Sequence, residues 1–408
     1  MTATQESYHP QTSCDLEKVI AWAAAENEPL EIIGNATKRN WGRPVQAAHL
    51  LSTDQLSGVV DYQPDELIMT AKAGTPVSEI ESLLDKHNQM LAFEPLQACH
   101  FWHETTRPST IGGIFATNQS GSRRLKAGAA RDFILGLEAV SGRGERFKAG
   151  GKVQKNVTGY DIARGFCSSW GTLFVATEIT FKVLPKPETE CTLALLGLSG
   201  QLATSAMSQA MASTCEVSSA AYLTSKLAEL CRGNPLAEYG SSTLLRLEGT
   251  PLSVRYRRDK LINELKHYAQ IEVMEAENSI SLWNEISNAS VFARESNPLW
   301  RISMAPSHAQ NFVEAIRSDL PAQILRDWAG GLLWLSVEGD DDYATPIREY
   351  LDKSGGGYAT LVRASAAIRS QVPVFQPQLQ PLEALSRSLK HQFDPAGILN
   401  PGRMNASF

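Results

Sequence analysis

The sequence lacks the features that mark several specialised classes of protein. Its cysteines are few: Cys14, Cys99, Cys167, Cys191, Cys215 and Cys231. The closest two are sixteen positions apart, so no C-x-x-C pair exists to hold zinc or an iron–sulfur cluster. The first fifteen residues lack the basic start and apolar segment of a secretory signal. No apolar run approaches the roughly 20 residues that span a bilayer. We expect a cytoplasmic chain that associates with a membrane only as part of a complex.

Excess positive charge, the usual mark of a nucleic-acid-binding protein, is also missing. The 408 residues carry 38 basic and 44 acidic side chains, a net charge of −6, and we expect no nucleic-acid partner. The charge is uneven, because residues 104–164 carry eleven Lys or Arg and five Asp or Glu, while the remainder carries −12. This segment is either a solvated basic surface or one that binds an anion such as a diphosphate.

The order of predicted elements divides the chain into domains. The first 185 residues predict strands, such as 30–33 and 173–184, with short helices at 14–26, capped by Ser13, and 77–87, capped by Thr75. After the prolines at 185 and 187, alternating helices and strands predict an antiparallel sheet with helices on one side. We therefore expect domains at 1–187 and 188–378, and a C-terminal segment, 379–408, that returns to the first domain.

Two glycine-containing loops follow predicted strands, at residues 34–42 and 110–121. Glycines and short side chains let backbone N–H groups approach an anion closely. Neither loop is G-x-G-x-x-G, and the chain has no G-x-x-x-x-G-K-[ST], so a Rossmann site and a P-loop are both disfavoured. Taken alone, these loops are equally compatible with ordinary tight turns.

Longer motifs are more specific. They are KNVTGYD at 155–161, SSWGTL at 168–173, TIGG at 110–113, ATNQSG at 116–121 and RD at 131–132. In order and spacing they resemble the FAD-binding domain of the vanillyl-alcohol-oxidase and para-cresol-methylhydroxylase (PCMH) family over residues 10–185. The resemblance implies an α+β fold: an FAD-binding domain of two α/β subdomains and an α+β cap domain with an antiparallel sheet.

The resemblance also implies the cofactor and its site. FAD would lie between the two subdomains, with its diphosphate held by backbone amides of the first loop. The first loop has neither His nor Cys, so we expect FAD to be bound noncovalently. The implied cofactor-binding residues are Ile33, Gly34, Asn35, Ala36, Thr37, Lys38, Pro95, Thr110, Ile111, Gly112, Gly113, Ala116, Thr117, Asn118, Gly121, Asn156, Asp161 and Val175.

Within this family the chain resembles the E subunits of bacterial glycolate oxidases. The motifs that carry this resemblance are LAFEP at 91–95, SRR at 122–124, RDFILG at 131–136, GGKV at 150–153 leading to KN at 155–156, WAGG at 328–331 with Trp334, and 393–403. It implies a subunit of a complex that oxidises glycolate to glyoxylate, with a second FAD-containing catalytic subunit and an iron–sulfur subunit as partners. This chain would be an accessory or electron-relaying subunit.

The sequence departs from the family pattern at several positions. Ala36, Ser168 and Phe174 stand where relatives have glycine, so FAD binding could be weakened by added side-chain volume. The loop at 96–108 is long and contains Cys99, His100 and His103, but three candidate ligands on an irregular loop are a weak pattern, and we expect no metal site.

Catalytic residues are not evident. In related catalytic subunits a close pair of histidines lies near the flavin, whereas here His267, His308 and His391 are far apart in sequence. We therefore assign no catalytic residue to this chain. Two alternatives stay open: a free-standing FAD-dependent 2-hydroxy-acid dehydrogenase, and a flavin-free scaffold subunit of the same complex. The basic run Arg123, Arg124 and Lys126 fits a diphosphate contact, a docking surface or plain surface charge.

Overall fold

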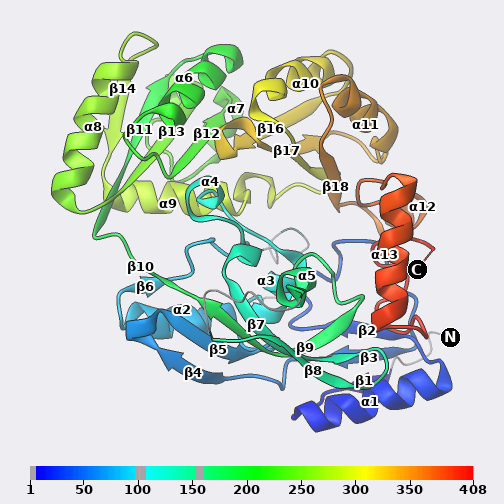
Figure 1. The fold of residues 1–408 in the computed structure, drawn as a ribbon. Coiled ribbons are helices and arrows are strands. Elements are labelled where there is room, and N and C mark those ends of the chain that lie inside the picture. The colour runs from blue at the N-terminus through cyan, green and yellow to red at the C-terminus, as the bar shows by residue number, and fades with distance from the viewer. Residues whose placement is uncertain (1–5, 98–100, 102–106, 153–159, 408) are drawn as a thin grey trace. The chain divides into compact units, whose positions relative to one another are not determined.

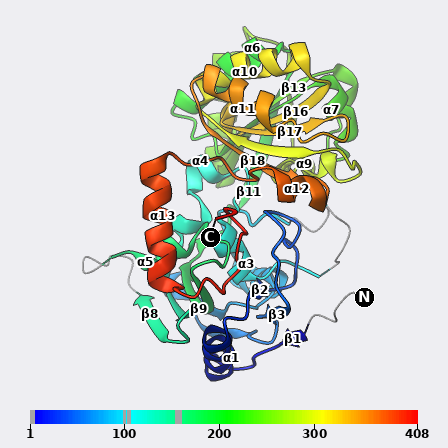
Figure 2. The ribbon, with the colours of Figure 1, turned by 90° about the vertical axis from the view of Figure 1, so that its right-hand side faces the viewer.

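The computed structural model describes residues 6–97, 101, 107–152 and 160–407. The chain forms two compact units, which Figures 1 and 2 show as ribbons. Unit 1 contains residues 1–119, 129–185 and 369–408, and unit 2 contains residues 120–128 and 186–368. These ranges differ from the expected domains by two residues at the first boundary and ten at the second, and 120–128 joins the second unit.

Unit 1 is built on two main sheets. A parallel sheet has the order β1-β3-β2, and an antiparallel sheet has the order β4-β5-β9-β7-β8. A short antiparallel pair joins β6 and β10. The strands are β1 (Glu6–Tyr8), β2 (Leu30–Ile33), β3 (His49–Ser52), β4 (Val59–Gln63), β5 (Ile68–Lys72), β6 (Gln89–Met90), β7 (Ile134–Ser141), β8 (Arg146–Gly150), β9 (Phe174–Lys182) and β10 (Leu184–Pro185), and the helices of four or more residues are α1 (Ser13–Glu26), α2 (Val77–Asp85), α3 (Ile111–Thr117), α5 (Ile162–Phe166), α12 (Ala366–Gln371, beginning in unit 2) and α13 (Gln380–Phe393).

The starts of α1 and α2 differ from the sequence prediction. Thr12, not Ser13, caps α1, because its hydroxyl accepts from the Asp15 amide while the Asp15 carboxylate accepts from the Thr12 amide. At α2 the N-cap position is Pro76, which has no side-chain donor or acceptor. The Thr75 hydroxyl donates to the Lys72 carbonyl, at 2.7 Å, and accepts from the Gly58 amide, at 2.9 Å, so it stabilises the preceding turn instead.

Unit 2 is an eight-stranded antiparallel sheet in the order β14-β11-β13-β12-β16-β17-β15-β18. Its strands are β11 (Thr189–Leu196), β12 (Ser219–Leu223), β13 (Ser242–Gly249), β14 (Ile271–Met274), β15 (Leu299–Ser303), β16 (Ala322–Asp327), β17 (Leu332–Val337) and β18 (Tyr358–Arg363), and its helices are α4 (Arg124–Ala127), α6 (Gly200–Ala212), α7 (Ser225–Leu230), α8 (Pro251–Leu265), α9 (Ala276–Ser287), α10 (Pro306–Asp319) and α11 (Ala344–Lys353).

Helices pack on both faces of this sheet, which corrects the prediction that they lie on one side. Leu193 and Leu195 of β11 belong to the apolar core formed with α6 and α8. Thr192, which points the opposite way, meets α9, since its hydroxyl is 2.7 Å from Ser279 Oγ and 2.8 Å from Trp283 Nε1. The sequence analysis missed α9, and with it the second covered face.

The C-terminal segment is fixed to unit 1 by a buried ion pair. Lys390 is 4% exposed and Asp394 1% exposed. The Lys390 ammonium donates to Asp394 and to the carbonyls of Thr172, at 2.7 Å, and Leu399, at 2.9 Å. The Asp394 carboxylate also accepts from the amides of Ile398 and Leu399. Burial lowers the pKa of Lys390, an effect that Asp394 opposes.

Asn400 extends this attachment to β2. Its side-chain oxygen accepts from the Ile32 amide at 2.8 Å, and its side-chain nitrogen donates to the Trp170 carbonyl at 2.8 Å. The backbone adds two more bonds, from the Leu30 amide to the Ile398 carbonyl and from the Asn400 amide to the Leu30 carbonyl. The chain end therefore acts as an additional edge of the parallel sheet. No helix in the described parts of the chain has the length and apolar character that a bilayer crossing requires.

We expect Asp394→Ala to lower the free energy of unfolding by about 3–5 kcal/mol, because it leaves the Lys390 charge buried without its partner. Urea denaturation followed by tryptophan fluorescence measures this. The matched control is Glu349→Ala, which breaks the i,i+4 pair with Lys353 at the surface of α11. That change should cost about 0–1 kcal/mol. Equal losses in the two variants would contradict the account.

Candidate functional site

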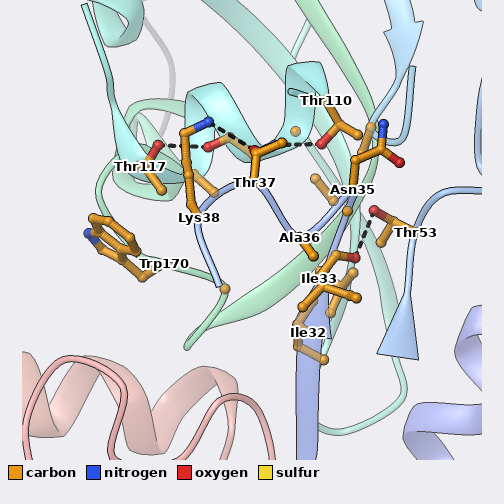
Figure 3. A pocket seen from close by; sticks show the side chains of 18 of the residues that line it. Ile32, Ile33, Asn35, Ala36, Thr37, Lys38, Thr53, Thr110, Thr117 and Trp170 are labelled. Carbon is orange, nitrogen blue, oxygen red and sulfur yellow. Dashed lines mark hydrogen bonds between the residues drawn. The ribbon is translucent and has the colours of Figure 1, made fainter. Parts of the chain in front are cut away.

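A cavity in unit 1 lies where the loop after β2 approaches α3 and β9, as Figure 3 shows. It encloses about 700 Å³ of atom-free space, counted up to its open mouth. Its lining is Ile32, Ile33, Gly34, Asn35, Ala36, Thr37, Lys38, Arg39, Thr53, Ala73, Thr110, Gly112, Gly113, Ala116, Thr117, Phe166, Trp170, Gly171, Phe174, Val175, Ala176 and Arg403.

The loop after β2 presents unused hydrogen-bond donors. The backbone amides of Asn35, Ala36 and Thr37 have no acceptor among the described residues. Ala36 has a φ of 60°, in the left-handed region, and such a turn can gather successive N–H groups into a concave anion site. Buried backbone amides are nearly always hydrogen-bonded in native proteins, and Asn35 and Thr37 are buried, so their amides point to an acceptor from outside the described residues.

Close packing explains the glycines at this site. A Cβ on Gly34 would lie 2.4 Å from the Thr110 hydroxyl, and a Cβ on Gly112 would lie 2.7 Å from the Ala73 carbonyl. Neither position accepts a side chain without moving α3. The Thr110 hydroxyl in turn accepts from the Gly113 amide and caps α3. α3 can therefore pack directly against the loop because neither glycine has a side chain.

The lining carries positive charge. Lys38 is 7% exposed, and its ammonium donates to Ser109 Oγ at 3.0 Å. Arg403 is 4% exposed and donates to the carbonyls of Arg39 and Arg43, but its Nε is buried and has no acceptor among the described residues. Burial lowers the pKa of Arg403 to about 10, so it remains charged at neutral pH. The cavity thus has the charge and the free donors that an anionic group requires.

The other side of the cavity is aromatic. The rings of Phe174 and Phe166 stack with centroids 5.5 Å apart, and Trp170 meets Trp41 at 5.7 Å. Trp170 is held in a left-handed conformation with φ of 54°, next to Ser168 with φ of 74°. Two of the three positions where the resemblance predicts glycine, Ala36 and Ser168, have backbone conformations that favour glycine. The third, Phe174, contributes a ring to the cavity wall.

The structure brings together twelve of the eighteen predicted cofactor residues and places five others elsewhere. Pro95 and Ile111 are buried outside the lining. Asn118 caps α3 and accepts from the Arg131 amide, and Asp161 caps α5. Gly121 belongs to unit 2. Asn156, and the loop residues Cys99, His100 and His103, lie outside the described residues. The lining residues that the sequence analysis missed are Ile32, Arg39, Thr53, Ala73, Phe166, Trp170, Gly171 and Arg403.

Residues considered for other roles lie away from the cavity. The three histidines after residue 200 are exposed, and none belongs to the lining. Arg123 pairs with Glu248 inside unit 2; burial would raise the pKa of Glu248, but Arg246 and Arg123 lower it. No group of three or more His, Cys, Asp or Glu that could hold a metal occurs in the part of the chain that the structure describes.

Comparison with known proteins agrees with a cavity that binds an anionic cofactor. Residues 7–150 match the family described as FAD binding domain. The fold is similar to 4-ethylphenol oxidase from Gulosibacter chungangensis, with a TM-score of 0.71, 15% identity and coverage of 99% of this chain and 90% of that one. It is similar to p-cresol methylhydroxylase to the same TM-score of 0.71, at 13% identity, covering 98% and 89% of the two chains. The chain thus has an FAD-binding domain and the PCMH-type fold, and the expectations of fold class and cofactor are confirmed.

The particular family follows from a full-length match. The chain is 34% identical over 385 residues to the glycolate oxidase subunit GlcE of Escherichia coli K12, covering 94% of this chain and 95% of that one. It therefore belongs to the GlcE family, which confirms the predicted resemblance. It is also 29% identical over 188 residues to the glycolate oxidase subunit GlcD of Bacillus subtilis, which covers 46% of this chain and 38% of GlcD.

We expect Ala36→Val to lower the melting temperature, because a β-branched residue is strongly disfavoured at a positive φ. The loss should correspond to more than about 1 kcal/mol, whereas Ala36→Gly should be neutral or mildly stabilising. Thermal unfolding measures both. The control is Ala48→Val, at an exposed position before β3 that does not have a positive φ. An effect of Ala48→Val as large as that of Ala36→Val would contradict the argument from φ.

Proposed function

We propose that this chain is an FAD-binding accessory or electron-relaying subunit of a complex that oxidises glycolate to glyoxylate. The observation that carries the proposal is the set of three free amides at Asn35–Thr37, in a cationic cavity of a chain from the GlcE family. The partners would be a second FAD-containing catalytic subunit, related to GlcD, and an iron–sulfur subunit.

The residues that line the cavity fit FAD. The amides of Asn35, Ala36 and Thr37, with the Arg403 Nε nearby in the lining, would hold the diphosphate. The side chains of Ala116, Val175 and Ala176 supply apolar surface for a ring system, and Phe174 and Trp170 supply aromatic surface. FAD would supply a reversible two-electron acceptor. The protein's contribution is to bind the cofactor, to orient it and to exclude water.

The accessory role rests on what the lining offers for proton transfer. Oxidation of a 2-hydroxy acid requires a base within hydrogen-bond reach of the hydroxyl proton. The described lining contributes hydroxyls, an amide, ammonium and guanidinium groups, and no histidine or carboxylate. These groups suit anion binding better than proton abstraction. We therefore assign substrate oxidation to the partner subunit.

The proposal is tested by the visible spectrum of the purified chain before and after anaerobic addition of glycolate. We expect a flavin band that glycolate does not bleach until the GlcD-like partner is added. Bleaching of the isolated chain would overturn the accessory role and favour a free-standing 2-hydroxy-acid dehydrogenase. Absence of a flavin band even after FAD is supplied would leave a flavin-free scaffold subunit.

A single substitution tests the proposed diphosphate contact. Ala36→Asp places a carboxylate beside the free amides, where it competes for them and repels the diphosphate, so we expect FAD affinity to fall at least tenfold. Titration of flavin fluorescence measures it. Ala48→Asp adds the same charge at an exposed position of the same unit and should leave the affinity within a factor of two. Equal affinities for the two variants would refute the contact.

A further inference from the structure

Arg301 in unit 2 lies on β15, at a position whose side chain shares a face of the sheet with its cross-strand neighbours. In the ladder it is opposite Trp334 of β17 and Thr360 of β18. Directly opposite residues project to the same face. The guanidinium carbon of Arg301 lies 5.0 Å from the ring centroid of Trp328 and 6.0 Å from that of Trp334. The guanidinium of Arg301 therefore lies against the aromatic surface of Trp328 and Trp334.

Arg301 is the exception among the buried or partly buried arginines of this sheet. Its side chain has no hydrogen bond or ion pair with any residue that the structure describes. The neighbouring strands show what is usual for this chain. Arg246 donates to Ser219, Arg326 donates to the Gly200 carbonyl and to Thr204, and Arg363 donates to the carbonyls of Phe292 and Asn297. The five donors of this partly buried guanidinium are therefore available to an acceptor from outside the described residues.

A second guanidinium lies nearby. Arg124, from α4 in the same unit, has its guanidinium carbon 4.4 Å from the Trp328 ring centroid. Burial lowers the pKa of Arg301 to about 10, and the positive charge of Arg124 lowers it further, while Asp327 opposes the shift. The Asp327 carboxylate already accepts from Ser122 Oγ at 2.7 Å and from the Trp328 amide at 2.7 Å. At neutral pH two positively charged guanidinium groups, those of Arg301 and Arg124, therefore lie against the Trp328 ring.

The segment that contains Trp328 has a strained backbone conformation. Trp328, Ala329 and Gly330 have consecutive positive φ values of 52°, 55° and 99°. For the two non-glycine residues this conformation costs roughly 1–2 kcal/mol each. The Trp328 indole is fixed further by a hydrogen bond from Nε1 to the Gly121 carbonyl at 2.9 Å. Such strain persists where surrounding contacts hold it, and it is concentrated at ligand sites.

We propose that Arg301 and Arg124, positioned by Trp328, form a binding site in unit 2 for a small carboxylate. A planar guanidinium pairs with a carboxylate through two parallel hydrogen bonds, and a second cation would favour the same anion. The site does not depend on FAD binding in unit 1. The choice of glycolate as the carboxylate to test does rest on the proposed function.

The test is calorimetric titration of the full purified chain with glycolate at constant ionic strength. We expect Arg301→Gln to weaken glycolate binding at least tenfold, and Arg301→Lys to weaken it less, because Lys keeps the charge but loses the paired donors. Arg255→Gln is the control, since it removes one positive charge from an exposed position on α8. It should leave glycolate binding unchanged.

Three results would overturn the site: no glycolate binding by the wild-type chain, equal binding by wild type and Arg301→Gln, or displacement of glycolate by an equal concentration of chloride. If Arg301→Gln does not fold, Arg124→Gln gives the same test, with an expected loss of at least threefold. The flavin content of each sample separates the two proposals. A chain that retains FAD but binds no glycolate contradicts this site alone, and a chain that binds glycolate without FAD contradicts the proposed function alone.

Discussion

The cavity of unit 1 depends on the buried pair of Lys390 and Asp394. A charge pair that excludes water is stable only when its remaining donors and acceptors are satisfied, and here the Thr172 and Leu399 carbonyls and the Ile398 and Leu399 amides do so. The pair fixes the turn after α13, and this turn determines where the last residues of the chain lie. Asn400 can then hydrogen-bond to both β2 and the Trp170 segment, which both contribute to the cavity lining.

This attachment explains how the site tolerates side chains at positions whose backbone conformation favours glycine. Ala36 and Ser168 have positive φ values that a free loop would relax, and the structure holds both of the segments that contain them. Arg403 binds the carbonyls of Arg39 and Arg43 just after Ala36, and Asn400 binds the Trp170 carbonyl just after Ser168. The strain is therefore offset by contacts from a part of the chain more than 200 residues away.

Local patterns predicted what depends on local chemistry. The bounds of β2, the PCMH-type resemblance and the loop at Asn35–Thr37 all follow from residues near one another in sequence. Arg403 was missed as a lining residue because its place depends on the return of the chain end. α9 was missed because the serines and asparagines on it obscure its apolar stripe, and Thr192, which it covers, is polar. The role of Gly121 could not be predicted, since the carbonyl that Trp328 uses belongs to backbone rather than to a side chain.

The central claim is that the amides of Asn35, Ala36 and Thr37 are the donors that FAD uses. Amide hydrogen exchange of the full chain, with and without saturating FAD, tests this most directly. The account predicts that these three amides exchange quickly in the free chain and become protected when FAD is added. Unchanged amide exchange rates at residues 34–38, at an FAD concentration that saturates the chain, would contradict it.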